Sequence, residues 1–198
     1  AHHIWASARR TLTGFALSAS LGIGLGLLFA GHGAARRTGH LLMEAIRVTP
    51  PLSLVPLLIL WLGIDEAPKV AIVFLSSFFP IYMNALTAIR GVDPKLREAG
   101  ALLGFSAWEQ FRYLTLPASL PGILTGLRLG FGYSWRALVG AELIAASSGL
   151  GFLISESAEF AKTDVVFVGI FTIAVLGVLA DGLLSLGFRA AERRGGAR

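Results

Sequence analysis

Cysteine is absent from the chain of 198 residues, and histidine is rare. Without cysteine the protein can form neither a disulfide framework nor a thiolate metal site. The histidines are His2, His3, His32 and His40, and none belongs to an HExxH or similar pattern of metal ligands. The sequence therefore predicts no metal site.

Lysine is scarce as well, since Lys69, Lys95 and Lys162 are the only lysines in the chain. None of them follows a glycine, so the phosphate-binding pattern GxxxxGKS or GxxxxGKT cannot occur. The chain cannot bind and split ATP in the P-loop manner, and we expect it not to be an enzyme. If its action is driven by ATP, another subunit must supply the ATPase.

Charge is low overall: 15% of the residues are charged, whereas a soluble domain carries about a quarter. Hydrophobic residues make up 55% of the chain and the mean hydropathy is +0.71. These values predict an integral membrane protein. The net charge of +5 does not indicate a nucleic-acid partner, because the basic residues cluster at the ends of apolar runs.

Five apolar segments are candidate membrane spans: 11–30, 48–63, 70–89, 117–146 and 165–188. A helix needs about 20 residues to cross the hydrocarbon, so segment 48–63 is only marginally long enough. The runs are continuous and do not alternate as strands would. The sequence predicts an all-α integral membrane protein in which residues 1–198 form a single transmembrane domain with five spans.

The distribution of lysine and arginine predicts how the chain is oriented in the membrane. If the loop 90–116 is cytoplasmic, then 31–40 and 189–198 are cytoplasmic too, and these three segments hold ten basic residues against four on the opposite side. Arg9 and Arg10 are the exception, just outside the first span. The C-terminal tail 189–198 is then cytoplasmic and the N-terminus external, which leads us to expect that an earlier span precedes this chain.

The connector 91–116 is too polar to span the membrane and is predicted to form two short helices that separate at Gly104. Gly100 and Gly104 lie four residues apart and open a smooth face on the first helix, which Gly104 then ends. Ser106 with Glu109 predicts a capping box at the start of the second helix.

The second predicted helix of the connector carries Trp108, Phe111 and Tyr113 beside Glu109 and Arg112. Aromatic side chains with polar neighbours are typical of a surface that binds a partner protein. They are equally typical of a helix that lies on the bilayer surface. The residues alone leave both interpretations open.

The connector carries a spaced pattern: Glu98, Ala99 and Gly104, then nine residues, then Leu114 and Leu116-Pro117. It resembles the EAA motif of binding-protein-dependent ABC importer permeases. Gly100 stands in place of the second alanine and Leu114 in place of the usual isoleucine. Glycine is small like alanine, and leucine is apolar like isoleucine. In that family the motif forms the coupling helix, which docks into a groove on the ATPase subunit. The resemblance implies an ATPase-coupling site of Glu98, Ala99, Gly100, Gly104, Ser106, Ala107, Trp108, Glu109, Phe111 and Arg112.

Other segments are similar to the aliphatic sulfonate, taurine and nitrate branch of this family: 56–63, 78–81, 116–121, 125–128, 141–144 and 148–151. The resemblance implies the type I importer architecture, which typically has six spans. It implies ATP-driven import of a small anion such as a sulfonate, taurine, nitrate or bicarbonate across the bacterial inner membrane by alternating access. It also implies the partners: ABC ATPase subunits that carry ATP and Mg, a second permease copy, a periplasmic or lipid-anchored binding protein, and membrane lipid. No cofactor is expected in this chain.

Charges inside the predicted span 117–146 share one helical face of about 120°, which holds Arg128, Trp135, Arg136 and Glu142. A charge at the bilayer centre costs roughly 2.5–3.5 kcal/mol or more, so this face should look into protein or water. One interpretation is the wall of a transport pathway in which Arg136 attracts an anion. The other is an Arg–Glu bracket between helices, with Arg128 reaching toward the cytoplasm.

Prolines in the span 48–63 each remove a backbone donor. They predict either a bent helix that lines the pathway or a helix that starts after Pro51 and has one kink. Serines in the span 70–89 either line a polar path or form hydrogen bonds between helices, and the pair Gly22 and Gly26 predicts close helix packing. The predicted pathway residues are Pro50, Ser53, Pro56, Ser76, Ser77, Tyr82, Trp135, Arg136 and Glu142.

Two other classes of function are alternatives to a permease subunit. A secondary transporter or channel that works without an ATPase predicts inverted repeats and an ion-coupling carboxylate at mid-membrane. The sequence has no repeat, and Glu142 alone is weak evidence for an ion-coupling carboxylate. An intramembrane enzyme needs a nucleophile with its base, or metal ligands, at membrane depth, and no histidine lies in a predicted span.

Overall fold

The computed structural model describes residues 2–32, 39 and 43–196, and every regular element among them is a helix. In chain order these are α1 (His2–Gly31), η1 (Pro51–Leu54), α3 (Val55–Leu62), α4 (Glu66–Arg90), α5 (Pro94–Leu102), α6 (Ala107–Gln110), η2 (Phe111–Thr115), α7 (Leu116–Ala145), α8 (Leu150–Glu159) and α9 (Thr163–Gly196). The predicted all-α class is confirmed. Most of the predicted loop 31–40 and the last two residues of the predicted tail 189–198 lie outside the described residues.

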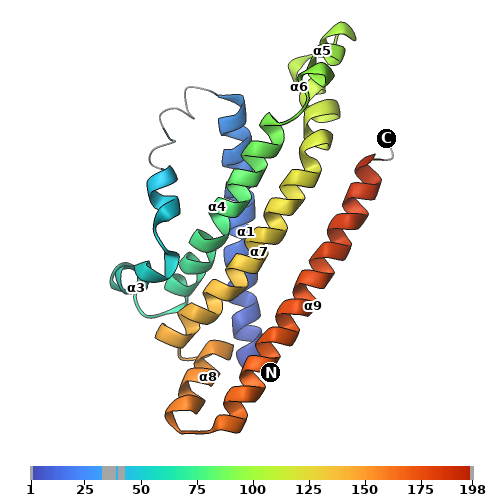
Figure 1. The fold of residues 1–198 in the computed structure, drawn as a ribbon. Coiled ribbons are helices and arrows are strands. Elements are labelled where there is room, and N and C mark those ends of the chain that lie inside the picture. The colour runs from blue at the N-terminus through green and yellow to red at the C-terminus, as the bar shows by residue number, and fades with distance from the viewer. Residues whose placement is uncertain (1, 33–38, 40–42, 197–198) are drawn as a thin grey trace.

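Three long helices, α1, α4 and α7, form the core of the bundle, with α4 packed along both of the others (Figure 1). Glycines allow this close packing. A Cβ at Gly14 of α1 would lie 2.6 Å from Val73 Cγ1, and one at Gly130 of α7 would lie 2.6 Å from Ile81 Cγ1. The packing predicted for Gly22 and Gly26 is confirmed, since both are buried against α4. Small residues here replace the side-chain layer that would otherwise separate the helices.

In the part of the chain that the structure describes, α1, α4 and α9 are each long and apolar enough to cross a membrane. The helix that runs through α7 makes a fourth candidate together with α8, across a bend of 40°. The fifth predicted segment, 48–63, contains a shorter apolar helix, Pro51–Leu62.

Segment 48–63 is not one continuous helix. It contains the 3-10 turn η1 and the eight-residue helix α3, and prolines stand in the first turn of each. Pro50 precedes η1 with extended backbone, φ −62° and ψ 123°. A proline fits the first turn of a helix, where no internal donor is needed, but not its interior. Helical backbone nevertheless runs without a gap from Pro51 to Leu62, and Pro56 stands where the 3-10 turn gives way to α-helix. This agrees with the predicted alternative of a helix that starts near Pro51.

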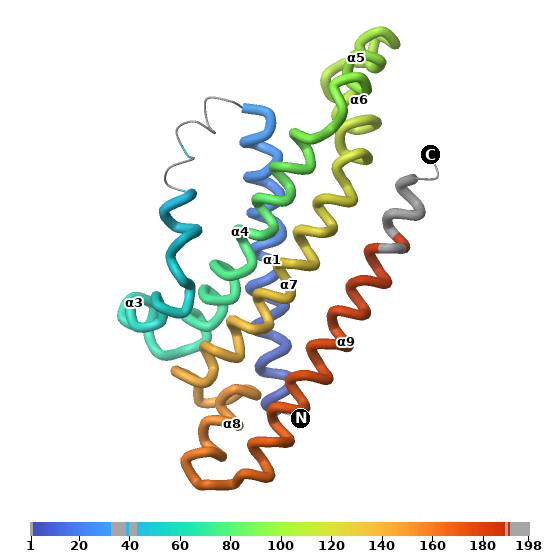
Figure 2. The backbone as a smooth tube through the Cα atoms, viewed as in Figure 1, coloured from blue at the N-terminus to red at the C-terminus, as the bar shows by residue number. Residues whose placement is uncertain are grey.

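The two ends of the bundle differ in character. The short helices α5 and α6 extend beyond one end, whereas α8, the start of α9 and the N-terminal turn of α1 lie at the other (Figure 2). α9 packs against α7 and α8. The connector that resembles a coupling motif is thus at the far end of the molecule from α8.

Candidate functional site

The predicted coupling segment, residues 91–116, is a helical hairpin whose turns are capped by its own residues. The Asp93 side chain accepts a hydrogen bond of 2.9 Å from the N–H of Lys95 at the start of α5. At the other end the N–H of Phe105 donates to the carbonyl of Gly100 at 2.9 Å, and that of Gly104 donates to Ala101 at 3.0 Å. This is a Schellman motif, and Gly104 has the positive φ of 76° that it requires. The predicted end of the first helix at Gly104 is confirmed.

The capping box predicted at the second helix is confirmed too. The Ser106 hydroxyl accepts from the N–H of Glu109 at 3.3 Å, and the Glu109 carboxylate accepts from the N–H of Ser106 at 2.8 Å. Hydrogen bonds from the Ser106 hydroxyl and backbone lower the pKa of the Glu109 carboxyl. The carboxylate therefore stays charged at the positive end of the helix dipole, which supports the turn.

Gly100 is buried where the two arms of the hairpin meet. A Cβ at this position would lie 2.6 Å from Leu114 Cδ1 and 3.2 Å from Gln110 Cγ. The glycine that replaces the second alanine of the EAA pattern thus lets α5 and η2 approach each other closely. The hairpin is held together by this contact, by the Schellman motif at Gly104 and by the capping box of Ser106 and Glu109.

The hairpin exposes large apolar side chains at the end of the bundle. Trp108 is 68% exposed and Tyr113 64%, and Leu102 and Leu103 at the tip are more exposed still. The Phe111 ring packs against Trp108, with 5.8 Å between the ring centroids. The other predicted coupling residues, Glu98, Ala99, Ser106, Ala107, Glu109 and Arg112, are exposed as well.

The second arm of the hairpin continues into the membrane bundle without a break. α6, the π-helical turn η2 and α7 form one apolar helix from Ala107 to Ala145. Pro117, in the first turn of α7, has no N–H, so the carbonyl one turn before it cannot make the usual α-helical bond. A π turn lies just before this proline, and the helix continues through it. The hairpin and α7 are therefore continuous along one helix.

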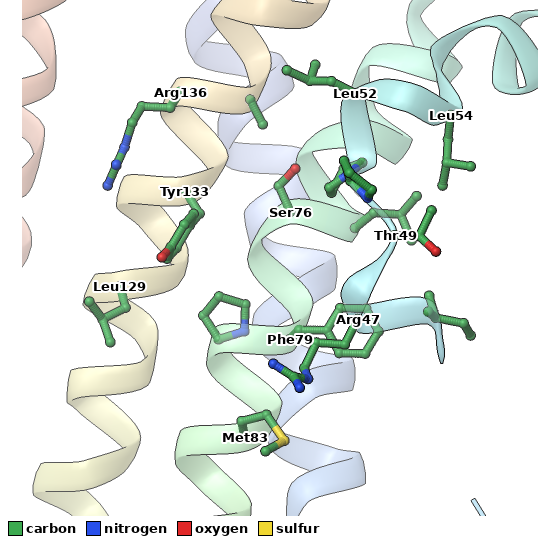
Figure 3. A pocket seen from close by; sticks show the side chains of 16 residues that line it. Arg47, Thr49, Leu52, Leu54, Ser76, Phe79, Met83, Leu129, Tyr133 and Arg136 are labelled. Atoms are coloured by element: carbon green, nitrogen blue, oxygen red, sulfur yellow. The ribbon is translucent and has the colours of Figure 1, made fainter. Parts of the chain in front are cut away.

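A pocket of 630 Å³ lies between α7, α4 and the segment 46–54 (Figure 3). Three predicted pathway residues line it, namely Pro50, Ser76 and Arg136. The other lining residues were not predicted from the sequence: Ile46, Arg47, Thr49, Pro51, Leu52, Leu54, Leu75, Phe79, Pro80, Met83, Leu129, Tyr133 and Ala137. The pocket is thus mostly apolar, with a few polar groups.

The polar groups of this pocket come from three elements. The Ser76 hydroxyl is buried and makes no hydrogen bond within the described part of the chain. Arg136 donates from Nε to the carbonyl of Gly132 at 3.0 Å, and its guanidinium lies 5.2 Å from the centroid of the Tyr133 ring. Arg47 pairs with Glu44 at 2.6 Å. Among the described residues no carboxylate pairs with Arg136, so its positive charge remains available to an anion.

The remaining predicted pathway residues lie elsewhere. Ser77 is fully buried and donates to Ser18 of α1 at 2.8 Å, so it joins two helices. The Tyr82 ring stacks on Phe78 with 5.8 Å between centroids. Ser53 bonds to the carbonyl of Pro50, Pro56 is exposed at the start of α3, and Trp135 contacts Gly177 of α9.

Glu142 does not line the pocket either. It is buried at the end of α7, where it pairs with Arg10 of α1 at 2.7 Å. Arg128, on the same helix, pairs with Asp181 of α9 at 2.7 Å. The face of charges on α7 is therefore held by ion pairs to two other helices, and Arg136 alone among these charges borders the pocket.

Comparison with known proteins identifies the class. A family model described as "binding-protein-dependent transport system inner membrane component" matches residues 22–189. The chain belongs to this family, the inner-membrane permease subunits of ABC importers.

Two relatives and one solved structure are informative. The chain is 42% identical to the protein named as the aliphatic sulfonates transport permease SsuC of Bacillus subtilis, over 93% of this chain and 67% of that protein. It is 38% identical to the taurine transport system permease TauC of Escherichia coli, over 97% and 68%. A chain of the MetNI methionine ABC transporter has the same fold, with a TM-score of 0.76 over 96% of this chain and 93% of that one at 17% identity. The predicted family branch and type I importer fold are confirmed.

Proposed function

We propose that this chain is the membrane-spanning subunit of an ATP-driven importer and that it moves a small anion inward by alternating access. The observation that carries the proposal is the coupling segment, a capped hairpin with exposed Trp108 and Tyr113 at one end of the bundle. A chain without a P-loop needs a separate ATPase, and this hairpin offers that partner an apolar surface. We assign the predicted coupling residues to this contact.

The continuous helix from Ala107 to Ala145 supports a direct route from the ATPase to the pathway. When the ATPases close on ATP, the hairpin moves with them and carries α7 along. Because α7 forms one wall of the pocket, the same movement changes the pocket. Coupling of this kind requires the hairpin to contact the ATPase differently in the two states.

The pocket is our candidate for part of the translocation path. Arg136 supplies positive charge, Ser76 supplies a hydroxyl that has no internal partner, and apolar side chains cover the rest. The names of the relatives, sulfonates and taurine, agree with a small anionic solute. A second permease copy would complete the path, and a binding protein would deliver the solute at the α8 end, which we place outside the cytoplasm.

The experiment is uptake into proteoliposomes that contain the permease with its ATPase. We expect Trp108→Ala to abolish uptake and the stimulation of ATPase activity, because it removes the largest exposed side chain of the hairpin. Trp61→Ala is the matched control, since Trp61 is 71% exposed on α3 and lies outside the coupling segment.

Normal ATP-driven uptake by the Trp108 variant would refute the coupling role. Uptake that is driven by an ion gradient without any ATPase would replace the proposal by a secondary transporter or channel.

A further inference from the structure

A cluster of buried charges lies at the end of the bundle where α8 is found, and the proposed transport function makes no use of it. We call it the Glu142 bracket: Ser7 and Arg10 of α1, Glu66 of α4, Glu142 of α7 and the first turn of α8. Arg10 is 1% exposed, and its guanidinium bonds to Glu142 at 2.7 Å and to Glu66 at 2.5 Å and 2.8 Å. One arginine thus joins three helices of the core.

The first turn of α8 is fastened to the same carboxylate. Glu142 accepts from the N–H of Gly151 at 3.0 Å and from the Ser7 hydroxyl at 2.8 Å, and Ser7 in turn accepts from the N–H of Leu150 at 2.9 Å. Arg10 also donates to the carbonyl of Ser148 at 2.6 Å. A carboxylate at a helix N-terminus satisfies donors that the helix itself leaves unpaired.

Two glycines bring the backbone of α8 up to Glu142. A Cβ at Gly149 would lie 2.3 Å from the Glu142 carboxyl carbon, and one at Gly151 would lie 2.7 Å from Glu142 Cβ. Gly149 also has a positive φ of 122°. The close approach therefore depends on these two residues, which explains why a Gly-Leu-Gly segment follows the glutamate at this spacing.

Separating the charged groups of the Glu142 bracket requires a large free energy. Glu142 and Arg10 are both buried, so separating them would leave the Glu142 carboxylate buried without a cation, while Arg10 would keep Glu66 as its only carboxylate partner. The carboxylate would also lose its bonds to Ser7 and to Gly151. A conformational change that keeps these contacts intact is therefore strongly favoured over one that breaks them.

We infer that the Glu142 bracket holds α8 to α1 and α7 as one rigid unit throughout the transport cycle, with Glu142 as its positioning residue. The inference rests on the proposed function, since it needs a transport cycle. It distinguishes two neighbouring regions: α8 stays fixed on α7, whereas the proposed function requires the pocket wall formed by segment 46–54 to move relative to α7.

The chain has no cysteine, so a pair of introduced cysteines can be bridged selectively by a short, cleavable bifunctional thiol reagent. His3→Cys with Phe152→Cys joins α1 to α8, where the native rings stack at 6.1 Å. Because this pair also removes the hydrogen bond of 3.1 Å from the Gly149 N–H to His3 Nδ1, the unbridged double variant is the reference. Leu52→Cys with Gly140→Cys joins η1 to α7, where a Cβ at Gly140 would lie 3.0 Å from Leu52 Cδ1. The assay is ATP-driven uptake by the reconstituted importer before and after bridging.

We expect the α1–α8 bridge to leave uptake unchanged and the η1–α7 bridge to stop it. Loss of uptake on bridging α1 to α8, with recovery when the bridge is cleaved, would overturn the inference. If neither bridge affects uptake, the rigid unit stands and the pocket loses its proposed role in the pathway. The two failures are thereby distinguishable.

A second measurement tests Glu142 itself. Glu142→Gln keeps the side-chain shape but removes the charge that pairs with Arg10, and we expect uptake to fall. If Glu142 acts by positioning α8, the α1–α8 bridge restores uptake in this variant. Ser7→Ala removes one donor to Glu142 and leaves Arg10 in place, so it serves the same test with less risk to folding. No rescue by the bridge in either variant would refute the positioning role.

Discussion

At the scale of single residues, Arg10 and Arg9 are adjacent arginines in very different surroundings. Arg10 is buried between two carboxylates, whereas the side chain of Arg9 is 58% exposed and bonds to Glu66 at 3.0 Å. Arg10→Met leaves Glu142 buried without a cation, and we expect it to lower the free energy of unfolding by about 3–5 kcal/mol. Arg9→Met should cost less than about 1 kcal/mol because its ion pair is in contact with solvent.

Thermal unfolding of the two purified variants in the same detergent is the measurement. Equal shifts in the melting temperature would contradict the assignment of Arg10 as the central charge of the bracket. The burial also explains why Arg10 breaks the charge rule for topology: its charge is neutralised inside the protein.

Arg136 is the residue on which the proposed anion specificity depends. Hydrogen bonds to charged groups contribute about 1.5–3 kcal/mol, so Arg136→Gln should raise the KM for an anionic solute by about tenfold or more. Arg136→Lys should lose less, because it keeps the charge. Arg128→Gln is the control, since Arg128 pairs with Asp181 and does not line this pocket. An unchanged KM in the Arg136→Gln variant would exclude Arg136 from solute binding.

At the scale of elements, the packing of α1 on α4 depends on which glycines face the neighbour. A Cβ at Gly26 would lie 2.9 Å from Ala85 Cβ and 3.2 Å from the Leu86 nitrogen, and neither atom can move easily. At Gly24, on the same helix, no atom lies within 4 Å. Gly26→Ala should therefore destabilise the bundle by about 1–3 kcal/mol through overpacking.

Gly24→Ala is the matched control and should be neutral or slightly stabilising, because alanine has the higher helix propensity. Both variants are compared by thermal unfolding. If they behave alike, the α1–α4 interface is looser than these distances indicate.

At the scale of the whole molecule, the two ends of the bundle should lie on opposite sides of the membrane. Lys95 in the coupling segment and Glu156 in α8 are both exposed, and the chain has no native cysteine. In intact cells without an outer membrane, a membrane-impermeant thiol reagent should label Glu156→Cys and should label Lys95→Cys only after lysis. The reverse pattern would invert the proposed orientation, and labelling of both in intact cells would contradict it.

Local patterns predicted the features whose partners are close in sequence. The capping box needs only Ser106 and Glu109, and the end of α5 needs only a glycine at Gly104. The glycine pair Gly22 and Gly26 correctly predicted a packing face without indicating the partner helix. The prolines of segment 48–63 correctly indicated a helix that begins near Pro51, but they did not indicate that its first turn is a 3-10 turn.

What the sequence by itself determined was the class of protein: low charge and apolar runs require a membrane, and the spaced EAA pattern implies the permease family. Only the tertiary structure decided what the intramembrane charges do. Glu142 and Arg10 are far apart along the chain, and a helical wheel of α7 cannot show which charge on another helix will meet it. The fold pairs Glu142 with Arg10 and Arg128 with Asp181, and it leaves Arg136 beside the pocket. Ion pairing depends on distances of a few ångströms, and only the packing of the helices sets those distances.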